Sequence, residues 1–550
     1  MQSPNCEAAR TVSKAARMGH PRRSRLVKPG TRGNTTGMLR HRLVLLIALL
    51  AGLAAGWGVI ELTEPPGPGL DPDAVSYLGA GVSMASGHGL RIPSGTWDSP
   101  DTTAALAHFP PGFSTAIAAG ITAGALPTNA ARFVEASAAA ITLFALALAA
   151  GAAAGPLGAL TVAGIIGFTP AMLVVHASVL SEPLFLALTA LFVLVLVRVP
   201  NEGRGATRVR RLLALSVIAA TASLVRYAGL ALVGAIVLDT WLAHRETPIV
   251  ARARRALLAA VLPVLPFLLW VLSRPTKTEK VAVRHTGLYL TGVGGTLAEG
   301  WDTLAHWLVP GVERDLVRTV AAIAGLVAIA LLFRAARAKT SNGTPTPTAL
   351  GRVQRASALV AVCYLGMVLL SRLAADPWIP LDDRLLSPAL VMGALAIGTT
   401  LAAWWQSGRT LTWRRHLTVV VTATWILTSY NVAHDWWNTY RDDGGDFAAR
   451  EWRLSPVVAY AAALPAGTPL YTNWPAAIWF HTGRAARMMP AGPDARTALA
   501  FGAKVAREHA VVLLFTTEGS DVIKPGTTIA RSGLTTLATF SDGAVWGAPH

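Results

Sequence analysis

The sequence predicts a polytopic α-helical membrane protein followed by a small exported α/β domain. Of the 550 residues, 53% are hydrophobic and only 14% are charged, and many windows of about 18 or more residues contain almost no charge. A backbone that crosses lipid must satisfy its hydrogen bonds within each helix, so these windows predict membrane-spanning helices. Apolar residues come in long runs and do not alternate with polar ones, which excludes an outer-membrane barrel.

The basic charge of the chain is concentrated in five short segments. They hold 27 of the 48 Lys and Arg residues against three acids, so they carry +24, and the rest of the chain, whose total is +18, carries −6. This bias is typical of cytoplasmic loops. We therefore expect no nucleic-acid partner, a cytoplasmic N-terminus and a multi-pass protein of the cell membrane. The five segments are 1–42, 198–211, 244–255, 334–355 and 406–416.

The apolar runs predict about eleven crossings and one half-helix. The segments 1–42 and 198–211 are both placed in the cytoplasm, so an even number of crossings must separate them, whereas hydropathy offers five apolar runs. The weakest run is Gly112–Leu126, which is short, rich in small residues and bracketed by Pro111 and Pro127. We interpret it as a half-helix that returns to the outer side. The predicted crossings are 43–60, 131–150, 156–174, 183–199, 211–225, 228–243, 256–273, 315–333, 356–373, 387–405 and 417–433.

Three parts of the chain are expected. A basic cytoplasmic tail covers 1–40, a transmembrane domain with a long outer loop at 61–130 covers 41–433, and an extracytoplasmic α/β domain covers 434–550. In the last part the apolar runs have the length of strands and alternate with helical segments, which is typical of an α/β layer. Its predicted strands are 469–473, 511–516, 535–540 and 544–547, and its predicted helices are 455–463, 475–482 and 497–509.

The outer loop 61–130 concentrates ionisable side chains between apolar segments. Pro72 and the helix-compatible residues after it place Asp73 at the start of a short helix, with Tyr77 on the same face four residues later. Asp73 is either the N-cap of this helix or a general base that deprotonates an acceptor hydroxyl. Asp71 would serve equally well as the cap.

Two further groups are candidates at the outer surface. His108 is held by the rigid turn of Pro110, Pro111 and Gly112, although such a turn is also an ordinary helix start. Glu182 begins an otherwise apolar helix. An acid at the mouth of an apolar segment is a functional candidate, but the helix dipole also favours an acid there.

The cations near the outer surface need anionic partners. Arg226 interrupts an apolar run, where a guanidinium is costly without a carboxylate or a lipid phosphate beside it. Arg384 lies just outside the predicted crossing 387–405 and would either form a salt bridge with Asp382 or Asp383 or bind phosphate.

The outer loop 274–290 is basic on the side where basic loops are uncommon. Lys277 and Lys280 in this loop favour an anionic lipid head group as ligand. The sequence contains no phosphate-binding loop, dinucleotide fingerprint or zinc-ligand spacing. No metal site and no cofactor are therefore expected, while dependence on a divalent metal stays open.

These residues resemble the GT-C class of integral-membrane glycosyltransferases. The similarity is strongest to the branch of protein O-mannosyltransferases and lipid A aminoarabinose transferases. It covers most of 41–433 and is carried by short motifs in the expected order. They are D-x-x-x-Y at 73–77, HFPPG at 108–112, SEP at 181–183, LVRY at 224–227 and RLLSP at 384–388.

The resemblance implies an inverting transfer of a sugar from a polyprenyl-phosphate donor to a cell-envelope acceptor (a glycan, lipid or protein) on the outer face of the membrane. It implies Asp73 as base, with Glu182 and His108 in the catalytic site. The residues that would bind substrate are Asp71, Tyr77, Arg226, Tyr227, Arg384, Lys277 and Lys280.

Two departures from the pattern keep the sugar and the acceptor open. Ala74 follows Asp73 where many members carry a second acid, and Leu385 follows Arg384 where the family has Tyr. The alternative function is a transporter or flippase of lipid-linked sugars. That class should show repeat symmetry and charges at mid-membrane, whereas here the charges gather at the outer face.

Overall fold

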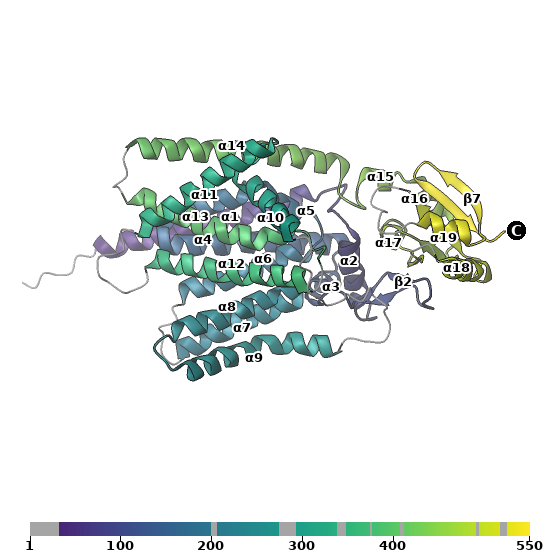
Figure 1. Cartoon of the computed structure of the whole chain (residues 1–550), viewed down its shortest axis with the longest axis horizontal. Helices are drawn as coiled ribbons and strands as arrows, with labels where there is room; N and C mark the ends of the chain where they lie inside the picture. The colour runs from purple at the N-terminus through teal and green to yellow at the C-terminus, as the bar shows by residue number, and fades with distance from the viewer. Residues whose placement is uncertain are drawn as a thin grey trace, which may run out of the picture.

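An elongated helical bundle carries a small sheet-containing domain at one end, with the start of α1 toward the other (Figure 1). The computed structural model describes residues 32–199, 206–273, 293–337, 348–374, 377–407, 412–490, 494–516 and 525–549. The helices of the bundle and its outer loops are α1 (Arg32–Leu62), α2 (Pro72–Ala85), α3 (Gly112–Thr122), α4 (Pro127–Gly167), α5 (Pro170–Ala177), α6 (Ser181–Arg198), α7 (Ala206–Val225), η1 (Tyr227–Gly229), α8 (Leu230–Ala243), α9 (Ile249–Ser273), α10 (Val293–Leu308), α11 (Asp315–Arg337), α12 (Ala349–Ala374), α13 (Asp383–Gln406) and α14 (Thr412–Asp443).

Helix α4 folds back on itself. Its 41 residues leave the helical conformation at Ala154 and Gly155, where Gly155 takes a φ of 63° that suits glycine. Ala147 and Ala159, on either side of this break, pack in one cluster with Val44 of α1. In a straight helix these two alanines would be about 18 Å apart. The two arms of α4 therefore run in opposite directions, as expected for the predicted crossings 131–150 and 156–174.

Seven helices in the described part of the chain are long and apolar enough to cross a membrane, the folded-back α4 among them. The protein is thus a mostly helical membrane protein. Helices α7, α8 and α14 contain three further predicted crossings but are too short or too polar by the same measure. The total of eleven stays a prediction. The expected half-helix corresponds to α3, which has only 11 residues and packs against α2.

The C-terminal domain, which is predicted to be exported and is called the exported domain for that reason, is built on a six-stranded mixed sheet of order β2-β5-β4-β6-β8-β7. Strands β2, β5, β4 and β6 are parallel, and β8 and β7 are antiparallel to their neighbours. Its strands are β2 (Ser94–Thr96), β4 (Leu470–Thr472), β5 (Ala486–Met488), β6 (Val511–Phe515), β7 (Thr535–Phe540) and β8 (Gly543–Gly547). Its helices are α15 (Arg450–Arg453), α16 (Pro456–Ala463), α17 (Pro475–Thr482), α18 (Ala495–Arg507) and α19 (Pro525–Arg531).

Strand β6 is the centre of this sheet because all five of its residues are apolar and buried. Val511, Leu513 and Phe515 pack in one cluster with α16 and α17, and Val512 and Leu514 pack in another with α18 and α19. A strand covered on both faces has a continuous apolar run instead of an alternating one. The domain is therefore a sheet between two helical layers, with its strands and helices close to the predicted positions.

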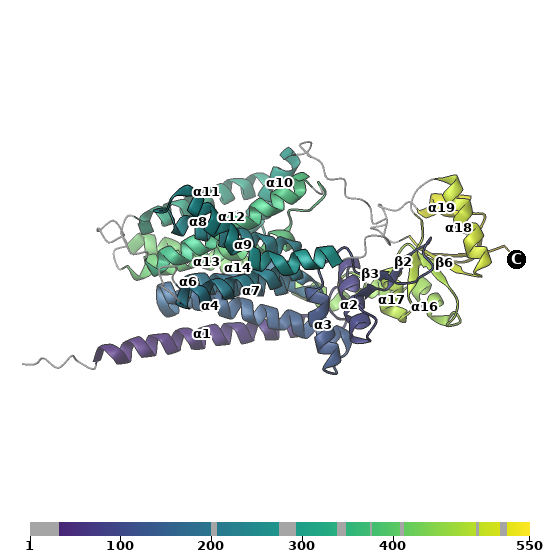
Figure 2. The same ribbon diagram turned by 90° about the horizontal axis from the view of Figure 1, so that it is seen from below.

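The edge strand β2 comes from the outer loop 61–130 and not from the C-terminal part of the chain. It follows β1 (Arg91–Ile92), which pairs with β3 (Ala104–Ala105) in a small hairpin. Seen from below, this hairpin lies between α2 and the exported domain (Figure 2). Helix α14 continues to Asp443, ten residues beyond the predicted crossing 417–433. Through β2, the loop 61–130 is therefore part of the same sheet as the C-terminal domain.

Candidate active site

The start of α2 separates the roles of two neighbouring carboxylates. Asp71 is the N-cap, and its Oδ1 accepts a hydrogen bond of 2.7 Å from the backbone N–H of Ala74. Pro72 occupies the first helical position, where its missing N–H costs nothing. Asp73 lies in the first turn, and its Oδ2 is 3.2 Å from Nη2 of Arg384. Of the two alternatives for the cap, the structure has Asp71.

Arg384 binds three carboxylates that come from distant parts of the sequence. Its guanidinium lies 3.2 Å from Asp71 and 3.2 Å from Asp73, and its Nε donates to Glu182 Oε1. Of the two alternatives for Arg384, the salt bridge with Asp382 or Asp383 is therefore not the one that the structure has. These two acids have other partners: Asp382 caps α13 through the N–H of Leu385 at 2.8 Å, and Asp383 accepts from Trp307 Nε1 at 2.7 Å.

Glu182 is the buried anchor of the cluster, with only 4% of its side chain exposed. Its Oε2 is 2.5 Å from Nη1 of Arg226, so each of its oxygens is held by a guanidinium. Ser181 completes the network, because its Oγ accepts from Arg226 at 3.0 Å and lies 3.1 Å from the hydroxyl of Tyr77. A carboxylate that loses this much water is tolerable only when such partners surround it. Ser181 is a site residue that the sequence reasoning missed, although it stands in the SEP motif.

A polar cavity of about 330 Å³ opens beside these groups. It is lined by seven predicted site residues, namely Asp73, Tyr77, His108, Glu182, Arg226, Tyr227 and Arg384. Asp71 does not line the cavity, but it accepts a hydrogen bond from Arg384, which does. Lys277 and Lys280 lie outside the described residues. Within the parts of the chain that the structure describes, no group of three or more His, Cys, Asp or Glu side chains is arranged to hold a metal ion.

The motifs HFPPG at 108–112 and LVRY at 224–227 pack against each other at Gly112. A side chain at Gly112, the end of HFPPG, would bring its Cβ within 2.7 Å of the carbonyl oxygen of Leu224 in LVRY. The absence of a side chain therefore lets the turn after His108 pack on the backbone just before Arg226. Phe109 in the same turn lies against the ring of Tyr77, with a centroid distance of 4.7 Å.

Three chain segments meet immediately before α2. Gly69 forms a parallel bridge with Ser178, and Leu70 forms one with Asp446. Any side chain at Gly69 would clash with the hydroxyl of Ser178, and Asp446 has an unusual φ of 51°. The structure brings Asp446 beside the start of α2, where its charge acts on Asp71.

Comparison with known proteins identifies the fold. No protein-family model and no curated protein sequence matches the chain. Among solved structures the chain is similar to the archaeal oligosaccharyltransferase AglB from Archaeoglobus fulgidus, which was solved in complex with an inhibitory peptide and a dolichol-phosphate. The two chains are 10% identical, the match covers 88% of this chain and 70% of that chain, and the TM-score is 0.51. The chain has the GT-C fold.

A second similar structure is ArnT, the aminoarabinose transferase, from Cupriavidus metallidurans bound to undecaprenyl phosphate. It is 14% identical, with 95% of this chain and 100% of that chain covered and a TM-score of 0.45.

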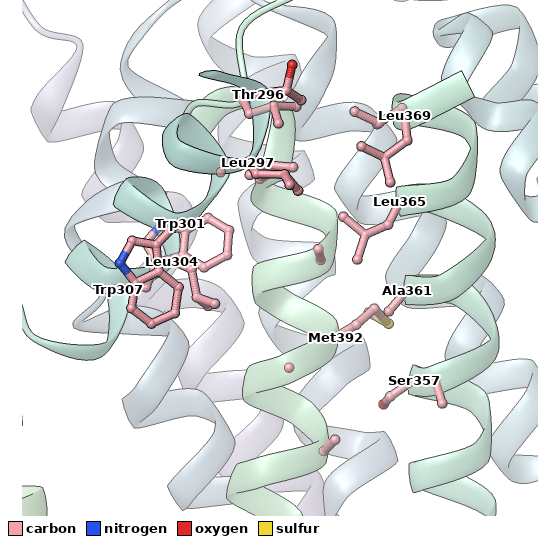
Figure 3. Close-up of a pocket in the computed structure, with 18 of the residues that line it drawn as sticks. Thr296, Leu297, Trp301, Leu304, Trp307, Ser357, Ala361, Leu365, Leu369 and Met392 are labelled. Atoms are coloured by element: carbon pink, nitrogen blue, oxygen red, sulfur yellow. The ribbon is translucent and has the colours of Figure 1, made fainter. Parts of the chain in front are cut away.

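An apolar cavity of about 640 Å³ adjoins the polar one in this GT-C bundle. Side chains from α10, α12 and α13 point into it, among them Leu297, Trp301, Leu365 and Met392 (Figure 3). The two cavities meet at the start of α13: Leu386 lines the apolar cavity, and Arg384 and Leu385 line the polar one. An elongated ligand with a charged head and an apolar tail would fit this arrangement.

The ionisation of Asp71 gives a testable pH dependence. Burial, and next the negative charge of Asp73, raise the pKa of Asp71 from 3.8 to about 6. Folding therefore favours the protonated form of the Asp71 carboxyl. The contribution of this form to the free energy of unfolding is complete below about pH 4 and is lost as the pH rises through about 6, where the folded protein must ionise the buried carboxyl. Asn caps a helix about as well as Asp but does not ionise. We expect wild type to lose stability relative to Asp71→Asn between pH 4 and 7, measured by thermal unfolding in detergent. A difference in melting temperature that is independent of pH would contradict this.

Proposed function

We propose that this protein transfers a sugar from a polyprenyl-phosphate donor to a cell-envelope acceptor on the outer face of the membrane. The observation that carries the proposal is the junction of the two cavities. One holds carboxylates and guanidinium groups, and the other is apolar and lies between membrane helices. The outer-face location is supported by the charge distribution, since the basic segments are typical of cytoplasmic loops.

Asp73 is the proposed general base. Of the three carboxylates around Arg384, Glu182 is almost fully buried with both oxygens held, and Asp71 is occupied as a helix cap. Asp73 lines the cavity and has 41% of its side chain exposed. An acceptor hydroxyl placed there would attack the anomeric carbon of the donor sugar. Asp73 takes the hydroxyl proton while the bond from this carbon to the phosphate oxygen breaks, which inverts the anomeric configuration.

Arg384 and Arg226 are the proposed phosphate ligands. Guanidinium groups bind phosphate through paired, charge-assisted hydrogen bonds. In the structure Arg384 Nη2 donates to Asp73 Oδ2. A donor phosphate that takes this nitrogen releases Asp73 for the acceptor hydroxyl, so donor binding and activation of the base are coupled. Glu182 keeps both guanidinium groups in position, and His108 and Tyr77 also line the cavity.

The apolar cavity is the proposed site of the prenyl chain. Gly393 lines this cavity and has open space where a side chain would begin. Gly393→Phe would therefore fill the cavity without a backbone clash, and we expect it to raise the KM for the donor about tenfold or more. Gly366→Phe on α12 is the matched control, because Gly366 also has open space around it but does not line the cavity.

The measurement is transfer of labelled sugar from a polyprenyl-phosphate donor to envelope acceptors in reconstituted membranes. Equal donor KM values for the two glycine variants would contradict the prenyl site. Movement of the labelled donor between leaflets without any transfer would contradict the enzymatic function and favour the flippase.

A further inference from the structure

The strand order of the exported domain creates a topological switch point between β4 and β6. From β4 the chain continues through α17 to β5 on one side, and from β5 it returns through α18 to β6 on the other side of β4. In open parallel sheets, ligands bind outside the carboxyl ends of the strands at such a point. Asn473 joins these two ends, because its side chain donates to Phe515 O and accepts from Phe515 N, both at 2.9 Å.

A cavity of about 590 Å³ lies next to this point, at the carboxyl end of β6 and the turn between β7 and β8. Its polar lining consists of Glu451, Ser455, Thr516, Ser541 and Asp542. Asp542 is held in place because its Oδ2 accepts from Ser455 Oγ, while its Oδ1 is buried and has no hydrogen-bond partner within the described residues. The rest of the lining is Trp452, Leu454, Pro456 and Phe515.

The lining selects the chemistry of a ligand. Glu451 and Asp542 would repel a phosphate or another anion, and no Lys or Arg belongs to the described lining. Carboxylates and hydroxyl groups are hydrogen-bond partners for the hydroxyl groups of a sugar. The exposed apolar side chain of Leu454 offers a surface for the C–H face of a sugar ring. The crevice is therefore suited to an uncharged chain that carries many hydroxyl groups.

The crevice lies on the side of the exported domain that faces the catalytic loop. Glu451 is only five positions after Asp446, which bridges Leu70 directly before the α2 cap. Five residues span at most about 18 Å. Helix α17, which begins directly after β4, also packs against α2. A ligand in the crevice would thus extend toward Asp73.

We infer that the crevice at the carboxyl end of β6, beside the turn between β7 and β8, binds the glycan chain of a neutral oligosaccharide acceptor, whose free end reaches Asp73. This inference rests on the proposed function and narrows its acceptor from a glycan, lipid or protein to a glycan. A single-sugar acceptor would occupy only the catalytic cavity, whereas a longer acceptor would also gain the contacts of the crevice.

The test compares acceptors of different length with the full-length protein in reconstituted membranes. The probes are neutral oligosaccharides of one to eight units, released from envelope polysaccharides of the host. We expect the KM to fall as the acceptor lengthens.

Asp542→Asn and Glu451→Gln should raise the KM for long acceptors about tenfold and leave the KM for single-sugar acceptors unchanged. Ser541→Trp should act in the same way by filling the crevice from an exposed position. Asp494→Asn, at the exposed cap of α18, is the matched control.

Direct binding of the same oligosaccharides, followed by saturation-transfer NMR without donor, separates this inference from the proposed function. If transfer fails but long oligosaccharides bind and Ser541→Trp abolishes binding, the crevice stands and the proposed activity is wrong. If transfer occurs with no dependence on acceptor length, or if unstructured peptides bind the crevice and sugars do not, the glycan site is overturned.

Discussion

Replacing Asp73 by Asn is expected to reduce sugar transfer by about 10²–10⁴-fold, the usual contribution of general-base assistance. The amide keeps the size and much of the hydrogen bonding of the carboxylate but does not accept the proton of the acceptor hydroxyl. Because Asp71 and not Asp73 caps α2, the variant should fold as wild type does. The measurement is the turnover of labelled polyprenyl-phosphate sugar in reconstituted membranes, with donor binding measured in parallel.

Asp71→Asn is the natural comparison, since it makes the same chemical change two residues earlier and at a carboxylate that does not line the cavity. Its turnover should fall far less than that of Asp73→Asn. A fully active Asp73→Asn enzyme would remove Asp73 from the mechanism, and Glu182 would become the next residue to test as base.

Replacing Arg384 by Gln is expected to damage both stability and donor binding. The change leaves Asp71 and Asp73 without their cation and Glu182 with Arg226 alone. Removal of one partner of a buried ion pair costs about 3–5 kcal/mol, and the effect should lie near the lower end because 30% of the Arg384 side chain is exposed. Thermal unfolding and donor affinity are the two measurements.

Two further variants separate geometry from charge at this position. Arg384→Lys keeps the charge but lacks the planar fork that reaches three carboxylates, so it should restore stability in part and donor binding poorly. Arg91→Gln removes an exposed ion pair with Asp101 in the same outer loop and should change neither quantity measurably. Wild-type donor affinity in Arg384→Gln would exclude Arg384 as a phosphate ligand.

The sequence by itself determined the class of the protein and the positions of most elements. Long apolar runs specify membrane helices because a backbone in lipid has no other way to satisfy its hydrogen bonds. The run Val511–Phe515 specified a buried strand in the same local manner. The chemistry-bearing residues were also visible, since Asp73, Glu182, Arg226 and Arg384 stand in or beside apolar segments where charge is costly.

The tertiary structure decided which of these residues meet. The sequence left Asp71 and Asp73 as equal candidates for the helix cap. In the structure Asp71 accepts the hydrogen bond of the Ala74 N–H, whereas Asp73 lines the polar cavity, and both contact Arg384 from the far end of the chain. The sequence offered the neighbouring Asp382 or Asp383 as one of two alternative partners for Arg384, but these acids accept hydrogen bonds from Leu385 N and Trp307 Nε1.

The same limit explains the remaining site features. Ser181 gains its role only because Tyr77 and Arg226 converge on its hydroxyl, and β2 joins the exported sheet from the outer loop, hundreds of residues before its partner β5. Propensity and periodicity act over a few residues of sequence, whereas ion pairs and strand registers form between groups that folding brings together through space. The sequence pattern therefore shows which types of residue the site contains, and only the tertiary structure shows which of them are partners.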